Sequence, residues 1–168
     1  MADFGLSLHP RKTRFLRFGR IVIQNAQTAG EGKPESFDFL GFTHLCSFTS
    51  LGKFTIRRQT MRKRRTPQLK RIRQELRRRL HDPISRTGAW LRRVVQGHIN
   101  YYGVPFNSPE VSAFCYRGTR SWYRALWRRS QRKRMNWQRF RRIAHYWLPS
   151  PRVVHPYPQK RFDAKYSR

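Results

Sequence analysis

Acidic residues are scarce in this chain, which excludes a surface whose charges largely cancel. Only 8 of its 168 residues are Asp or Glu, against 38 Lys or Arg, so the formal net charge is +30. With so few carboxylates, intramolecular ion pairs can neutralise only a small part of that charge. We expect the (i, i+4) pairs that stabilise ordinary solvated helices to be absent. A polyanionic partner is the first expectation for such a chain.

Cysteine and long apolar runs are also scarce. The 2 cysteines, Cys46 and Cys115, lie far apart and have no ligand-like neighbours, so we expect buried free thiols and a cytoplasmic location. The 6 histidines show no metal-ligand spacing, and no Ser/His/Asp set can be assembled. We therefore expect the chain to bind no cofactor by itself. No apolar run approaches the length of a membrane span, and we expect no membrane partner.

Aromatic residues, in contrast, are plentiful, and their abundance argues against disorder. They make up 14% of the chain and recur at helical spacing, whereas disordered chains are poor in them. Arginine greatly outnumbers lysine. Because the guanidinium group binds phosphate as a planar fork and stacks on bases, this bias favours RNA as the partner.

The first third of the chain predicts β-structure. Residues 6–23 alternate between apolar and polar, which predicts short strands. Residues 24–36 contain glycine and proline and predict an exposed loop. Residues 37–42 form a compact apolar strand or turn. Residues 45–57 predict a hairpin in which Gly52 supplies a positive φ.

A basic amphipathic helix is predicted next. Thr66 is a suitable N-cap with Pro67 at the first helical position, and Pro83 ends the segment. One narrow apolar stripe is predicted to be buried: Leu69, Ile72, Leu76 and Leu80.

Three further helices are predicted, over 89–102, from Ser108 onward, and in a short segment capped by Asn136. After Leu148 the proline content predicts an extended strap. Four tryptophans fall on buried stripes: Trp90, Trp122, Trp137 and Trp147. Trp127 lies off its stripe and is the best candidate for stacking on a base. His98 is expected to be a hydrogen-bonded core histidine.

Two short motifs suggest a family. The run His9–Arg14 leads into the segment 15–18, and Phe37–Phe42 follows the predicted loop. Together they resemble the last two palm blocks of bacterial group II intron reverse transcriptases, the intron-encoded maturases. The basic and Trp/Arg-rich helices resemble the thumb, or maturase-specific domain, of the same family. Nothing in the sequence matches the family's paired-aspartate turn.

The resemblance implies an α+β fold, mainly α. Residues 1–58 would be a β-rich palm remnant, 59–148 a basic thumb or maturase domain of three to four helices, and 149–168 a Pro-rich basic tail. It also places Lys12 where the family has a lysine near the departing pyrophosphate, although a surface lysine on a strand edge is the simpler interpretation.

We expect the basic helical faces to bind RNA, the alternative being an ordinary solvated surface. Tyr101 enters this set because its segment resembles a Tyr-rich part of the family's thumb. The predicted RNA-binding residues are Lys12, Arg14, Arg57, Arg58, Arg62, Lys63, Arg64, Arg65, Lys70, Arg73, Arg77, Tyr101, Arg120, Arg124, Trp127 and Arg128.

The function implied is that of a truncated, non-enzymatic maturase that binds structured group II intron RNA and assists its splicing and mobility. DNA target and an upstream reverse-transcriptase fragment are further candidate partners. The alternative is the C-terminal subunit of a split RNA-directed DNA polymerase, which would use Mg²⁺ only with a catalytic palm supplied in trans. A basic structural protein of the ribosomal kind is a third interpretation.

Overall fold

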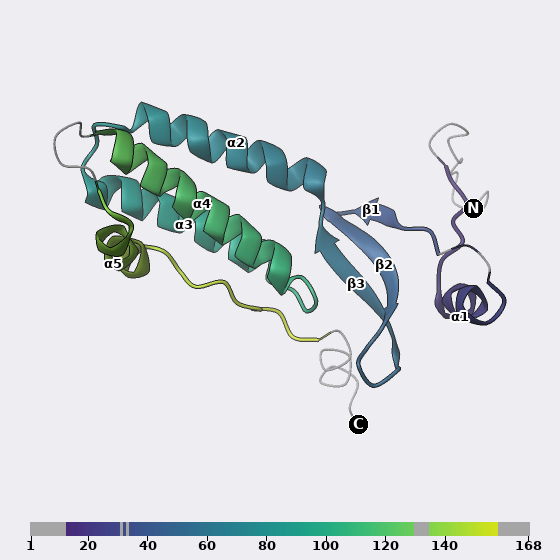
Figure 1. The fold of residues 1–168 in the computed structure, drawn as a ribbon. Helices are drawn as coiled ribbons and strands as arrows, with labels where there is room; N and C mark the ends of the chain where they lie inside the picture. The colour runs from purple at the N-terminus through teal and green to yellow at the C-terminus, as the bar shows by residue number, and fades with distance from the viewer. Residues whose placement is uncertain (1–12, 31, 33, 130–134, 158–168) are drawn as a thin grey trace, which may run out of the picture. The chain divides into compact units, whose positions relative to one another are not determined.

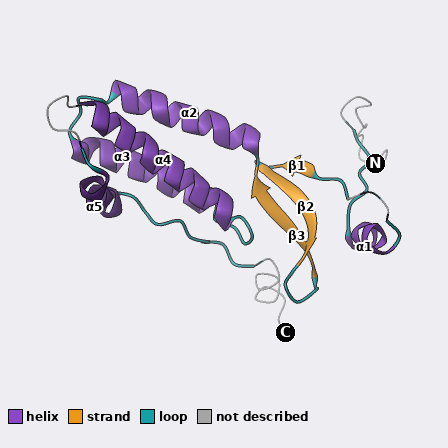
Figure 2. Cartoon of the chain, in the orientation of Figure 1, coloured by secondary structure: helices purple, strands orange, loops and turns teal. Residues whose placement is uncertain are grey.

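The computed structural model describes residues 13–30, 32, 34–129 and 135–157, and its fold is α+β and mainly helical (Figures 1 and 2), which confirms the predicted fold class. The elements are α1 (Arg20–Thr28), β1 (Phe37–Phe39), β2 (Phe42–Phe48), β3 (Phe54–Thr60), α2 (Arg62–Arg78), α3 (Ile84–Tyr102), α4 (Ser108–Arg129) and α5 (Trp137–Trp147). The strands form one sheet in the order β1-β2-β3, and their short connections make neighbouring strands antiparallel.

The chain divides into two compact units. The smaller unit contains the described residues up to Phe37, together with His44–Ile56, and the helical unit contains Asp38–Thr43 and the described residues from Arg57 onward. The chain therefore passes from one unit to the other three times, and the last passage, between Ile56 and Arg57, lies next to the boundary expected at residue 58. The segment Asp38–Thr43, however, belongs to the helical unit, whereas we predicted it to be part of the palm remnant over residues 1–58.

The strands predicted over residues 6–23 are wrong where the structure describes them. Residues 13–18 have no regular structure, and α1 occupies the next part and the start of the expected loop at 24–36. Gly19 causes the change, because its φ of 128° ends the extended run and its carbonyl accepts a hydrogen bond from the Ile23 N–H at 3.2 Å. Residues 6–12 lie outside the described part.

The smaller unit also contains the predicted hairpin. The Thr49 N–H donates to the Lys53 carbonyl at 2.8 Å, and Gly52 has a φ of 71°, as expected. Cys46 is a free thiol, but it is half-buried rather than buried, and its sulfur lies 3.3 Å from the Gly19 nitrogen.

Helix α2 begins earlier than predicted. Thr66 does not cap it, and Pro67 lies inside the helix, which starts at Arg62. Met61 fixes this start: its N–H donates to the Gly41 carbonyl at 3.0 Å, and its own carbonyl accepts from the N–H groups of Arg64 and Arg65. This contact between distant residues outweighs the local signal of a proline at the first helical position.

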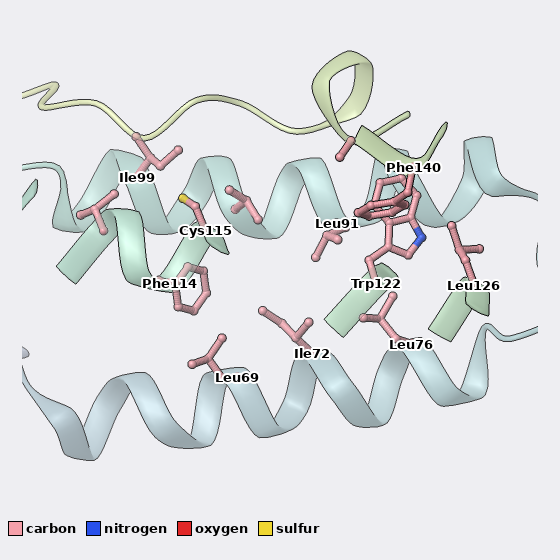
Figure 3. Packing of buried hydrophobic residues seen from close by; sticks show 13 residues of the cluster. Leu69, Ile72, Leu76, Leu91, Ile99, Phe114, Cys115, Trp122, Leu126 and Phe140 are labelled. Carbon is pink, nitrogen blue, oxygen red and sulfur yellow. The ribbon is translucent and has the colours of Figure 1, made fainter. Parts of the chain in front are cut away.

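Three long helices enclose the core (Figure 3). Helix α3 begins at Ile84, five residues before the predicted start, and α4 begins at Ser108 as predicted. The predicted stripe of α2 is buried except for Leu80, which is half-buried. The core consists of Leu69, Ile72, Leu76, Leu91, Val95, Ile99, Val111, Phe114, Cys115, Trp122, Leu126, Phe140 and Ala144.

Helices α2 and α4 lie side by side and run in the same direction (Figure 1). Near their starts, Arg65 forms an ion pair with Glu110. Beyond the end of α2, Nη1 of Arg129 donates to the Asp82 carbonyl at 2.8 Å. Helix α3 runs in the opposite direction, since His98 near its end lies beside Gln68 near the start of α2.

Helix α5 closes the other side of the core. The Asn136 side chain accepts from the Arg139 N–H at 2.7 Å, which confirms the predicted cap. Phe140 is buried with its ring 5.6 Å from that of Trp122. The predicted burial of Trp137 is wrong: this side chain is 39% exposed and packs edge-on against Tyr123.

Gly88 allows α5 to approach α3. A Cβ atom at Gly88 would lie 2.7 Å from the Trp147 ring and 3.1 Å from Trp122. We expect Gly88→Ala to lower the free energy of unfolding by about 2 kcal/mol, because the ring must shift in a packed interior. Gly97→Ala is the control: Gly97 is exposed with nothing within 4 Å, so this change should stabilise α3 by about 0.5–1 kcal/mol. Chemical denaturation measures both, and equal stability of the two variants would contradict this packing.

The segment 149–157 is extended, as predicted, and it is docked on the end of α3. The Val154 N–H donates to the Gly103 carbonyl at 2.8 Å, and Nε2 of His155 lies 2.5 Å from the Asn100 carbonyl. A Cβ at Gly103 would lie 2.8 Å from the Arg152 carbonyl oxygen, so only glycine permits this approach.

Candidate nucleic-acid interface

Two rows of basic side chains follow the parallel helices α2 and α4. The row on α2 has i, i+3, i+7 spacing and that on α4 has i, i+7, i+11 spacing, so each row lies along one side of its helix. All six side chains are exposed. We call this surface the α2–α4 face, and it consists of Lys70, Arg73, Arg77, Arg117, Arg124 and Arg128.

The acidic residues of these helices are engaged elsewhere. Glu110 pairs with Arg65. Glu75 accepts from Nε of Arg79 at 2.8 Å, an (i, i+4) pair, so the expectation that such pairs are absent is wrong at this position. Within the described residues no ion pair involves the six side chains of the α2–α4 face. Their positive charge therefore remains available to a partner.

Arg117 of the α2–α4 face acts electrostatically on Arg65, a neighbouring arginine of α2. Burial lowers the pKa of Arg65 below its usual value, and the nearby Arg117 and Arg62 lower it further. An arginine of α4 is thus close enough to one of α2 to oppose its charge. Phosphate groups placed along the two rows would relieve this repulsion.

The other predicted binding residues are distributed less evenly. Arg62, Lys63, Arg64 and Arg120 are exposed on the same two helices, whereas Arg57 and Arg58 on β3 are half-buried. Arg65 is only 15% exposed and is held by Glu110, so it serves the packing of α2 on α4. Arg14 belongs to the smaller unit, where it pairs with Glu35. Lys12 lies outside the described residues.

The predicted set omitted Arg117, which the structure places in the α4 row. Its seven-residue spacing from Arg124 is the signal that identifies it, because residues seven apart share one face of a helix.

Aromatic side chains accompany the arginines on α4. Trp127 is 40% exposed, as expected from its place off the buried stripe. The guanidinium of Arg120 lies over the Tyr116 ring, 5.7 Å from its centre, and both side chains are exposed. Exposed aromatic and arginine planes of this kind can stack on unpaired bases.

The tight turn between β1 and β2 is held by the end of α3. Leu40 and Gly41 have φ values of 46° and 81°, so both central residues of the turn are left-handed, as in type I′ hairpins. The Tyr101 hydroxyl donates to the Leu40 carbonyl at 2.7 Å, and a Cβ at Gly41 would lie 3.0 Å from the Tyr102 hydroxyl. A side chain at this position would therefore crowd the Tyr102 hydroxyl. The Tyr101 hydroxyl is thus used within the protein.

Beside this turn is a shallow pocket of about 520 Å³, lined by Asp38, Phe39, Leu40, Gly41, Met61, Arg64, Tyr101 and Tyr102. The exposed Arg64 brings positive charge to its wall, so the pocket continues the basic surface of α2.

Asn107 joins the end of β3 to the helices. Its side chain is fully buried. The amide oxygen accepts from the Thr60 N–H at 2.9 Å, and the amide nitrogen donates to the Thr60 hydroxyl at 2.8 Å and the Tyr102 carbonyl at 2.7 Å. These bonds place the start of α2 against the start of α4, which sets the register of the two basic rows.

His98 is a core residue, as predicted. Its ring stacks on Phe114 with centres 3.5 Å apart, and Nδ1 lies 3.1 Å from Oε1 of Gln68. Burial lowers the pKa of His98 to about 4, and the positive charge of Arg65 lowers it further. The ring is therefore neutral at physiological pH and adds no charge to the interface.

No group of three or more His, Cys, Asp or Glu residues in the described ranges is arranged to hold a metal ion. None of the helices described is long and apolar enough to cross a membrane. Comparisons with protein-family models, with curated proteins and with solved structures found no match to this chain.

Proposed function

We propose that this protein is a maturase-type RNA-binding protein that binds structured group II intron RNA and assists its splicing and mobility. One observation carries the RNA-binding part of the proposal. The α2–α4 face sets two parallel rows of basic side chains on a rigid helical core, and no ion pair within the described residues neutralises them.

The geometry suits a phosphate backbone. Helices packed side by side have axes about 9 Å apart, so the two rows form a double line of positively charged groups, five of them guanidinium groups. Each arginine can bind a phosphate through two parallel hydrogen bonds. Charge supplied in this way offsets repulsion between neighbouring RNA helices and favours a compact RNA. Under the proposal the intron ribozyme performs cleavage and joining, and the protein contributes binding.

The two N-terminal motifs are the reason for proposing group II intron RNA, rather than another RNA, as the partner. Phe37–Phe42 resembles a palm block of the intron-encoded proteins, and its turn is held by Tyr101. The same resemblance suggests a DNA target or a reverse-transcriptase fragment as further partners. The two free cysteines favour a cytoplasmic location. Lys12 remains a predicted RNA-binding residue, with a surface lysine as the simpler interpretation.

Competition binding tests the choice of RNA. A labelled group II intron RNA is bound to the full chain near physiological salt, and unlabelled intron RNA or ribosomal RNA fragments of equal length are added. We expect the intron RNA to compete at least about tenfold more effectively, a difference of about 1.4 kcal/mol. Equal competition would identify a general basic RNA-binding protein and overturn the intron assignment.

A further inference from the structure

A second basic surface lies on α3, α5 and the docked strap. On α5, Arg139, Arg142 and Tyr146 have i, i+3, i+7 spacing and so share one side of the helix. On α3, Arg92 lies one turn after Gly88, the residue that contacts Trp147 of α5. Arg152 extends the surface along the strap. All five side chains are exposed. We call this the α3–α5 face: Arg92, Arg139, Arg142, Tyr146 and Arg152.

This surface lies across the core from α2. Helix α5 packs on α3 and α4, and Figure 3 shows core side chains between α2 and Phe140 of α5. Phe140 of α5 contacts Trp122, and Leu76 of α2 belongs to the same buried cluster. The exposed arginines of α5 and the basic row of α2 therefore lie on different sides of the core.

The α3–α5 face is more one-sided in charge than the α2–α4 face. The sequence has no Asp or Glu over 84–102 or over 137–157. No ion pair within the described residues involves Arg92, Arg139, Arg142 or Arg152. The exposed stripe of α5 also lacks aliphatic side chains, which excludes the apolar contact that a membrane-surface helix needs.

We propose that the α3–α5 face binds a second RNA segment, so that one protein molecule bridges two RNA duplexes. This inference rests on the proposed RNA-binding function and extends it. A single straight duplex on the α2–α4 face cannot also reach the other side of the core. Arginine forks suit the phosphates of the second duplex, and Tyr146, 76% exposed, offers a stacking surface for an unpaired base.

A two-colour bridging assay tests this inference. Two RNA duplexes with different fluorophores are mixed with the full chain, and energy transfer or coincident diffusion reports complexes that contain both. Arg139→Gln/Arg142→Gln should reduce bridging at least about tenfold, and the affinity for a single duplex should change less than about threefold. The matched control is Arg20→Gln/Lys53→Gln, which removes two exposed positive charges from the smaller unit and should leave bridging unchanged.

The outcomes separate the two proposals. Unchanged bridging in Arg139→Gln/Arg142→Gln, or an equal loss in the control, would overturn the second face and leave the α2–α4 face intact. If the unmodified protein binds a single duplex but never bridges two, the second face is likewise overturned and the α2–α4 face is left intact. Failure of the unmodified protein to bind even one duplex would overturn RNA binding itself. Both α5 side chains are exposed, so thermal melting should show that the variant remains folded.

Discussion

Replacing Arg73 and Arg124 together with Gln is expected to weaken binding to structured RNA about twentyfold at 0.15 M salt. One residue is removed from each row of the α2–α4 face. Each phosphate that a basic side chain neutralises contributes about 0.8 to the slope of log affinity against log salt, which is about fivefold in affinity at this salt concentration. Two lost contacts multiply to about twentyfold. Fluorescence anisotropy with a labelled duplex measures the change.

The control for this variant is again Arg20→Gln/Lys53→Gln, which lowers the net charge by the same amount. It should weaken binding less than about threefold, because the lost charges lie outside the α2–α4 face. If the two variants weaken binding equally, net charge rather than the arrangement of the two rows determines RNA affinity, and the proposed interface is wrong.

Replacing Asn107 with Ala is expected to lower the free energy of unfolding by about 3–5 kcal/mol. The substitution leaves the Thr60 N–H and the Tyr102 carbonyl without the bonds that the amide now makes. Each polar group left unsatisfied in the interior costs about 1–3 kcal/mol, and the cavity adds to this. Urea or thermal denaturation measures the loss.

Asn136→Ala provides the comparison for Asn107. Asn136 makes one side-chain bond, to the Arg139 N–H in an exposed cap, so its loss should cost only about 1 kcal/mol. A destabilisation at Asn107 no larger than that at Asn136 would show that this residue does not hold β3 to the helices.

The sequence predicted much of the helical unit because its signals are local. The spacing of Leu69, Ile72 and Leu76 identified the buried side of α2 and thereby its charged side. The same reasoning placed the arginines on the outside of α4. Gly52 and Asn136 were predicted in their roles because a hairpin turn and a helix cap each depend on a few neighbouring residues.

The sequence predictions were wrong where distant residues decide the structure. The start of α2 depends on the hydrogen bond between Met61 and Gly41, which lie far apart in the chain. Helix α1 replaced a predicted strand because Gly19 takes up a positive φ, which the alternating pattern does not reveal.

The candidate site shows the same division. Arg124 and Arg128 were predicted from their periodicity alone. Arg65 is held by Glu110, a residue on another helix. The consecutive basic residues around Arg65 therefore gave no sign that its role differs from that of its exposed neighbours. The α3–α5 face was also invisible in the sequence, because its residues come together only when α5 packs on α3.

The salt dependence of RNA affinity is the most direct measurement of whether the exposed arginine rows bind phosphate. Six phosphates neutralised by the α2–α4 face should give a linear plot of log affinity against log salt with a slope of about −4 to −5. A slope near zero between 50 and 300 mM salt would show that phosphate contacts do not drive binding, and it would contradict the proposed interface.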